Sequence, residues 1–100
     1  MENLDAICAI PGISALWVGP NDMTTNVGIP NEYDSPQLIE IIQRVITTAE
    51  RSHIPAGCWF GKPEQALRTI RQGARFVVYS NDSSMLKDAM TAAFTALRKG

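Results

Sequence analysis

The residues best suited to chemistry lie in one short segment, from Val18 to Gly28, which reads VGPNDMTTNVG and directly follows an apolar run. Gly19 lets the backbone approach a ligand closely, and Pro20 favours the first turn of a short helix that exposes the amides of Asn21 and Asp22. Such amides can bind a carboxylate, and Asp22 offers a hard oxygen ligand to Mg²⁺ or Mn²⁺. Taken alone, the pattern favours a plainer interpretation, a turn in which Asp22 caps a helix.

The elements around this segment alternate between short apolar runs and helical periodicity. Strands are expected at 14–18, 56–60 and 75–79, because each run is apolar and bounded by turn residues. Helices are expected from Pro36 with Ser35 as its cap, from Pro63 to about Gln72 with Gly73 as its stop, and from a cap at Asp82 or Ser83. The expected inward residues are 38, 41, 42, 45, 46 and 49 in the first helix, 66, 67 and 70 in the second, and 86, 89, 90, 93, 94 and 97 in the third.

Strands that alternate with helices imply parallel βαβ crossovers and therefore an α/β fold. Periodicity does not separate an open doubly wound sheet from an eight-fold barrel. In either case three strands are too few, because a barrel takes about 250 residues and one apolar face would stay uncovered. Residues 1–10 resemble the tail of a helix whose preceding strand is absent. Residues 1–100 are expected to form one unit without an internal domain boundary.

Composition excludes several classes of function. Nine basic and ten acidic residues are spread without a cluster, which argues against binding to nucleic acid or to an anionic membrane surface. The longest apolar stretch, 6–18, contains Pro11 and Gly12 and is shorter than the roughly 20 residues of a membrane span. Because Glu2 and Asp5 precede it, it does not resemble a secretory signal, and a cytoplasmic location is expected.

The remaining reactive side chains suit plain structural roles. Cys8 and Cys58 match neither a zinc pair nor a redox motif and are expected to be small buried hydrophobes. His53 suits a solvated helix end. Asp82 suits a helix cap better than a site, and Trp17 is expected in the core. For Trp59, at the end of a strand, two interpretations are equally supported, core packing and contact with a substrate pocket.

A family resemblance extends over nearly the whole chain. The run WVGPNDMTTNVG resembles the signature loop of the HpcH/HpaI aldolases, in which a strand ends in GPxDLSxxLG or a near variant. NLDAICAIPGI before it, SPQLIEIIQRVITTAERSHIPAG after it and the closing FVVYSNDSSML stand in the family's order and spacing. The resemblance implies a modified (β/α)8 TIM barrel, of which this chain would hold about the last three βα units, its C-terminal portion.

The resemblance also implies a chemistry. It implies a class II aldolase or lyase that cleaves 4-hydroxy-2-oxo acids to pyruvate and an aldehyde, with a divalent metal ion (Mg²⁺ or Mn²⁺) as cofactor. Asp22 would be a metal ligand, and the amides of Asn21 and Asp22 would hold the pyruvate carboxylate. Apolar side chains such as Trp59 would lie near the substrate, and a homo-oligomer is expected.

The departures from the family pattern matter as well. The family's metal-binding Glu, its pyruvate-binding Arg and its His–Asp pair belong to earlier barrel strands, and Ser80 stands where the family often has Gly. A second hypothesis is therefore a non-catalytic remnant or interaction module. A third is an open-sheet domain with a small-molecule site at the same loop.

Overall fold

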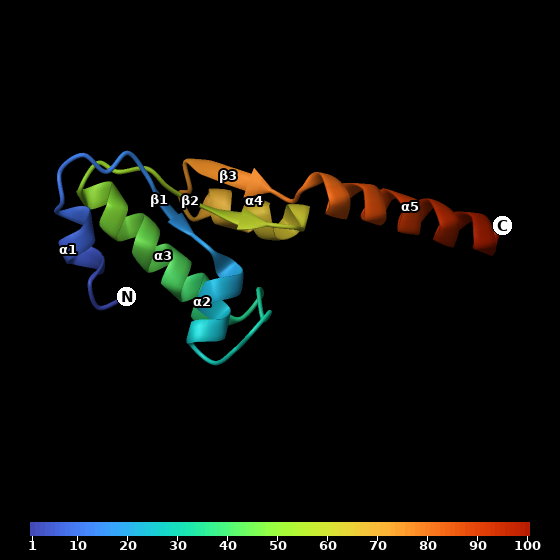
Figure 1. Cartoon of the computed structure of the whole chain (residues 1–100), viewed down its shortest axis with the longest axis horizontal. Coiled ribbons are helices and arrows are strands. Elements are labelled where there is room, and N and C mark those ends of the chain that lie inside the picture. The colour runs from blue at the N-terminus through green and yellow to red at the C-terminus, as the bar shows by residue number, and fades with distance from the viewer.

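The computed structural model describes residues 1–100 and consists of helices that alternate with a parallel sheet (Figure 1). In chain order the elements are α1 (Leu4–Cys8), β1 (Leu16–Val18), α2 (Pro20–Asn26), α3 (Pro36–Arg51), β2 (Ala56–Phe60), α4 (Pro63–Arg71), β3 (Phe76–Tyr79) and α5 (Asp82–Lys99). The strands form one three-stranded sheet in the order β1-β2-β3, and both pairings are parallel. The predicted α/β fold is thereby confirmed.

The helices begin and end largely where local chemistry predicts. Pro20, Pro36 and Pro63 are each the first residue of a helix, and Ser35 caps α3 by accepting a hydrogen bond from the Gln37 amide at 3.3 Å. Gly73 follows α4 with φ of +112°, the left-handed conformation in which glycine ends a helix.

The cap of α5 lies one residue earlier than the sequence pattern predicts. Asn81 is the cap, because its Oδ1 accepts a hydrogen bond from the Ser84 amide at 2.8 Å. Asp82 is the first residue of the helix instead, and its carboxylate accepts from the neighbouring Ser83 amide at 2.8 Å. Asn, Asp and Ser stand consecutively at 81–83, and all three types cap helices well, so sequence alone cannot rank them.

One face of the sheet packs on the helices and forms the core. Val18, Ala56, Cys58 and Phe60 are buried on this face, together with the α3 residues Leu38, Ile42, Val45, Ile46 and Ala49. Cys8 is buried as well, so both cysteines are small core residues as predicted. Burial raises the pKa of the Cys58 thiol.

The opposite face of the sheet is left uncovered. Side chains alternate between faces along a strand, and the registers align Trp17 with Gly57 and Phe76, and Trp59 with Val78. Trp17 is 53% exposed and Val78 45% exposed. The expectation that Trp17 lies in the core is therefore wrong, because the residue faces away from the helices that build the core.

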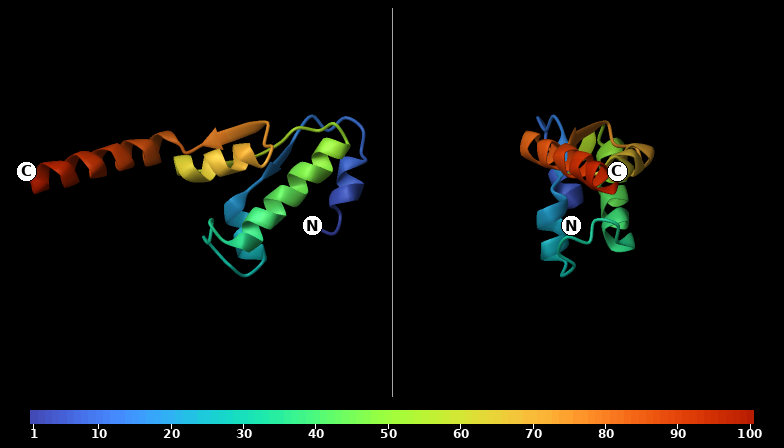
Figure 2. Two further views of the ribbon diagram at one scale, coloured as in Figure 1. Left: turned by 180° about the vertical axis from the view of Figure 1, so that it is seen from behind. Right: turned by 90° about the vertical axis from the view of Figure 1, so that its right-hand side faces the viewer.

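The last two helices also bury less than their periodicity predicts. In α4, Ala66 is buried as expected, but Leu67 and Ile70 are exposed, and Gln65 and Thr69 are buried in their place. In α5 no residue is buried. The helix continues from the end of β3 away from the rest of the molecule (Figures 1 and 2). No helix in the structure combines the length and the apolar character that crossing a membrane requires.

Candidate functional site

The VGPND segment forms the carboxyl end of β1 and the start of α2, as predicted. Val18 ends the strand, Gly19 is the residue before the helix, and Pro20 is the first helical residue. The amides of Asn21 and Asp22 lie in the first turn and have no intrahelical acceptor. Gly19 has no side chain that could cap them. In a parallel sheet this end of the strand is where ligands bind.

Thr24 fixes the shape of this segment. Its side chain is fully buried, and its Oγ1 donates to the carbonyl oxygen of Pro20 at 2.8 Å. Thr24 Oγ1 also accepts a hydrogen bond from the Asn31 amide at 3.2 Å, which connects the following loop to α2. These two hydrogen bonds of Thr24 therefore hold the first turn of α2, with Asn21 and Asp22, in a defined position.

A hollow of about 740 Å³ lies beside β1, and Asp22 is on its wall. Residues of α1, β1 and α2 line it, and we call it the β1 hollow. Its polar members are Asn3, Asp22 and Asn26, and its apolar members include Leu4, Ile7, Trp17 and Met23. Asp22 is exposed, and its Oδ2 would lie 3.8 Å from a Cβ added at Gly19. Asn21 is exposed too, but it does not line the hollow.

The residues present fit a divalent cation only in part. Asp22 provides one carboxylate oxygen donor, and Asn26, four residues later on α2, lines the same hollow with an amide. No group of three or more His, Cys, Asp or Glu side chains is placed to share an ion. Mg²⁺ commonly keeps several waters and takes one or two carboxylates from a protein, so Asp22 fits as one ligand of an incomplete set.

Trp59 lies at the mouth of the neighbouring strand, in a different hollow. It is half-buried, and its indole Nε1 donates to the carbonyl oxygen of Ser80 at 2.9 Å. The hollow beside it, of about 230 Å³, does not include Asp22. The structure therefore does not bring the expected substrate residues Asp22 and Trp59 into one hollow.

Two features of the site are not evident from the sequence pattern that identifies Asp22. Asn26 carries no motif of its own, although its spacing of four from Asp22 places both on one side of a helix. Ser80 stands out in the sequence only as a departure from glycine, whereas it has a left-handed backbone and a buried hydroxyl without a partner. His53, by contrast, is exposed after the end of α3, as expected for a solvated helix end.

Comparison with known proteins agrees with this arrangement. The family model described as HpcH/HpaI aldolase/citrate lyase matches residues 1–89. The 2-keto-3-deoxy-L-rhamnonate aldolase of Escherichia coli K12 is 27% identical over all 100 residues, and the chain spans 38% of that relative's length.

Solved structures show the same fold. An HpcH/HpaI aldolase from Desulfitobacterium hafniense superposes with a TM-score of 0.89 at 22% identity, covering 99% of this chain and 39% of that one. An HpcH/HpaI aldolase/citrate lyase family protein from Burkholderia cenocepacia gives a TM-score of 0.89 at 26% identity, covering 97% and 38%. Because the family model matches residues 1–89 of the 100, the chain belongs to the HpcH/HpaI aldolase/citrate lyase family.

Proposed function

We propose that this chain contributes the GPND half of the active site of a carbon–carbon lyase, which cleaves 4-hydroxy-2-oxo acids to pyruvate and an aldehyde. The observation that carries the proposal is the position of Asp22, on the wall of the β1 hollow at the carboxyl end of a parallel strand. The relative named for 2-keto-3-deoxy-L-rhamnonate supports a 2-oxo acid as substrate.

The reaction explains why a carboxylate and free amides would stand together. In a retro-aldol cleavage the C3–C4 bond breaks, the C4 hydroxyl gives up its proton, and the electron pair enters the enolate of pyruvate. A divalent cation, Mg²⁺ or Mn²⁺, would stabilise that negative charge as a Lewis acid. In the proposal Asp22 is one of its ligands, and the amides of Asn21 and Asp22 hold and orient the substrate carboxylate.

The remaining assignments follow from the same proposal. The chain would form about the last three βα units of a (β/α)8 barrel, residues 1–100, with the face of Trp17 and Trp59 directed inward. Trp59 would border the substrate from the second strand. The open edge of β1, paired only with β2, is where the strand that completes the ligand set would lie. We place the protein in the cytoplasm and expect a homo-oligomer.

Binding of Mn²⁺ with oxalate, an analogue of the pyruvate enolate, tests the proposal on this chain. Paramagnetic broadening of amide resonances by Mn²⁺ should be centred on Gly19 to Asn26. Asp22→Asn should weaken the binding at least about tenfold, the loss of one charged ligand. Asp82→Asn is the matched control, because Asp82 is also an exposed carboxylate in the first turn of a helix after a strand. Equal broadening in wild type and Asp22→Asn would refute the assignment of Asp22.

A second candidate is an interaction module without catalysis. The exposed apolar residues of α5, among them Leu86, Met90 and Phe94, favour it. A coupled assay for pyruvate release, run with a racemic 4-hydroxy-2-oxo acid and Mn²⁺, separates the two. Metal-dependent release that Asp22→Asn abolishes supports the lyase. No release, together with Mn²⁺ binding that is the same in wild type and Asp22→Asn, supports the module.

A further inference from the structure

Ser80 stands at the mouth of β3 in a state that the fold itself disfavours. Its φ is +53°, a left-handed conformation that costs little for glycine but is strained for serine. The residue is 6% exposed, and its Oγ is buried without a hydrogen-bond partner. A glycine here would remove both penalties, so the hydroxyl is not explained by the folding of this chain.

Both backbone polar groups of Ser80 have hydrogen-bond partners, so its hydroxyl is the only polar group of the residue without one. Its amide donates to the carbonyl oxygen of Phe60 at 2.9 Å, and its carbonyl oxygen accepts from the Trp59 indole at 2.9 Å. These two bonds fix Ser80 between the ends of β2 and β3. The unpartnered Oγ is therefore held in place rather than left to move with a loose loop.

Ser80 lines the hollow of about 230 Å³ beside Trp59, which we call the β3 hollow, and basic groups gather there. Lys62 lines it from the residue before α4 and Lys87 from α5, together with Ser84 and Gln65. The only carboxylate on its wall is Asp88, so the lining carries a net charge of +1, from two ammonium groups and one carboxylate. The first turn of α4 has no side-chain cap, and its one carboxylate, Glu64, does not line the hollow.

We propose that the β3 hollow binds an oxyanion, the carboxylate or phosphate group of a small molecule, with Ser80 as hydrogen-bond donor and Lys62 and Lys87 as the charged groups. The hydroxyl gains the partner that it lacks, and hydrogen bonds from cationic or hydroxyl donors to an anion are the strong ones. The site does not depend on Asp22, which lies on α2 and lines the other hollow.

Titration with inorganic phosphate and with succinate tests this site and separates the two sources of the oxyanion. Emission from Trp59, bonded to Ser80, reports binding in a Trp17→Phe background, where Trp59 is the only tryptophan. Ser80→Gly should weaken binding about tenfold, as expected for one hydrogen bond to an anion, while its melting temperature stays equal or rises. Lys87→Met should weaken binding to a similar extent, and Asp88→Asn should strengthen it.

Two control variants separate binding in the β3 hollow from attraction by overall charge and from binding near Asp22. Lys99→Met removes a charge from the far end of α5 and should leave the affinity unchanged. Asp22→Asn should also leave it unchanged, so that failure of the lyase proposal and failure of this one can be told apart. Equal affinity of wild type and Ser80→Gly for both anions overturns the proposal. So does a loss in Lys99→Met as large as that in Lys87→Met, because this indicates attraction by overall charge alone.

Discussion

Arg68 is the residue that connects the segment between α2 and α3 to the sheet. Its Nη1 donates to Asp34 Oδ1 at 2.8 Å and its Nη2 to the carbonyl oxygen of Tyr33 at 2.8 Å. The guanidinium lies 5.7 Å from the centre of the Phe60 ring, and the Tyr33 ring meets Phe60 edge-on at 6.3 Å. Arg68 on α4 therefore holds the segment between α2 and α3 against the end of β2.

The Asp34 carboxylate makes this connection dependent on pH. Hydrogen bonds from Arg68 and then from Gln65 lower the pKa of Asp34 below its ordinary value of 3.8. A carboxylate with a lowered pKa stabilises the fold above its unfolded pKa, and this contribution is lost as the pH falls through the folded value. The Asp34 side chain is 70% exposed, so the contribution should stay below about 1 kcal/mol.

Urea unfolding of wild type and Asp34→Asn at two pH values measures this contribution. At about pH 6 the variant should be less stable by a few tenths of a kcal/mol, and at about pH 2 the two proteins should have the same free energy of unfolding. Glu32→Gln removes a neighbouring exposed carboxylate that has no ion pair and serves as the control. A difference between wild type and Asp34→Asn that is unchanged at low pH would contradict the role of the ion pair.

At the scale of elements, the close contact between β2 and β3 depends on Gly57. A Cβ added at this position would overlap the backbone oxygen of Phe76 and would lie 2.9 Å from its ring. A backbone atom in a paired strand cannot move away without breaking the ladder. Gly57→Ala should therefore destabilise the protein by about 3 kcal/mol or more, measured by chemical denaturation.

Gly61→Ala provides the matched comparison at the end of the same strand. Its added Cβ would meet only the edge of the Trp59 ring at 3.4 Å, and its backbone is not left-handed. This substitution should cost less than about 1 kcal/mol, because a side chain can adjust by a few tenths of an ångström. If both variants lost similar stability, the steric explanation for Gly57 would be wrong.

The order and type of the elements are predictable because they depend on local signals. The proline at the first position of α2, α3 and α4, the Ser35 cap and Gly73 all act within a few residues, and the structure has them where the sequence pattern places them. The GPND loop is predictable for the same reason. Pro20 restricts its own φ and begins the helix, whatever surrounds the loop.

Burial is less predictable, because it depends on what covers an apolar face. Periodicity identifies Leu67 and Ile70 as apolar positions of α4, yet the smaller Ala66 and Thr69 pack inward, and both larger residues are exposed. Trp17 is exposed for the same reason on the open face of the sheet. The unpartnered hydroxyl of Ser80 is also not predictable from the sequence, because neither residue type nor spacing indicates that a hydrogen bond is missing.

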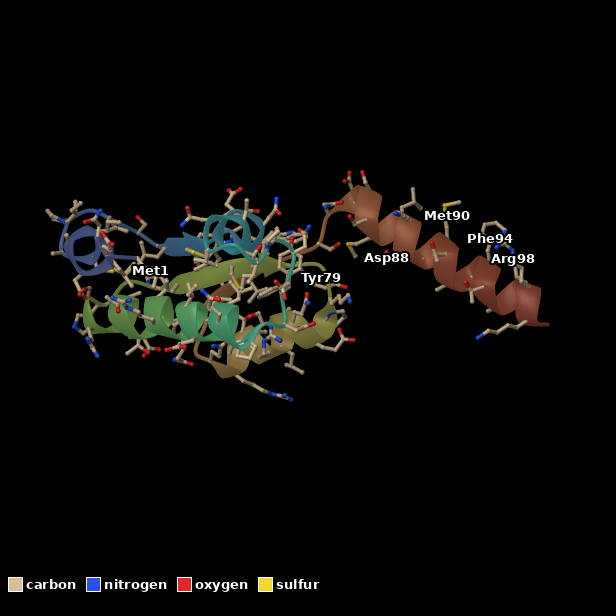
Figure 3. The ribbon with its side chains drawn as sticks, turned by 90° about the horizontal axis from the view of Figure 1, so that it is seen from below. Met1, Tyr79, Asp88, Met90, Phe94 and Arg98 are labelled. Atoms are coloured by element: carbon tan, nitrogen blue, oxygen red, sulfur yellow. The ribbon has the colours of Figure 1, made fainter.

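The whole molecule is more extended than its length requires. Its radius of gyration is 16.1 Å and its extents are 57 × 27 × 21 Å, whereas a compact domain of 100 residues has a radius near 13 Å. The excess comes from α5, which carries Met90, Phe94 and Arg98 out from the body (Figure 3). Leu86, Met90, Phe94 and Leu97 recur at spacings of four, four and three, so they form one exposed apolar stripe.

We expect this stripe to pack against a second copy of the chain. The body exposes apolar residues of its own, namely Leu67 and Ile70 on α4 and Tyr79, the last residue of β3. Two copies that exchange α5 helices would cover both sets reciprocally, in the manner of a two-fold interface. The pair is then stabilised by the burial of apolar surface that stays exposed to water in the isolated chain.

Sedimentation equilibrium across a range of concentrations measures this association. The wild-type chain should associate at micromolar concentration, and Phe94→Glu should shift it towards the monomer by at least about tenfold in the dissociation constant, since a charge would enter an apolar contact. Ala92→Glu adds the same charge to the other side of α5 and should leave the association unchanged. A wild-type chain that sediments as a monodisperse monomer and melts cooperatively would show that α5 needs no partner. The stripe would then be a solvent-exposed face that the fold tolerates without use.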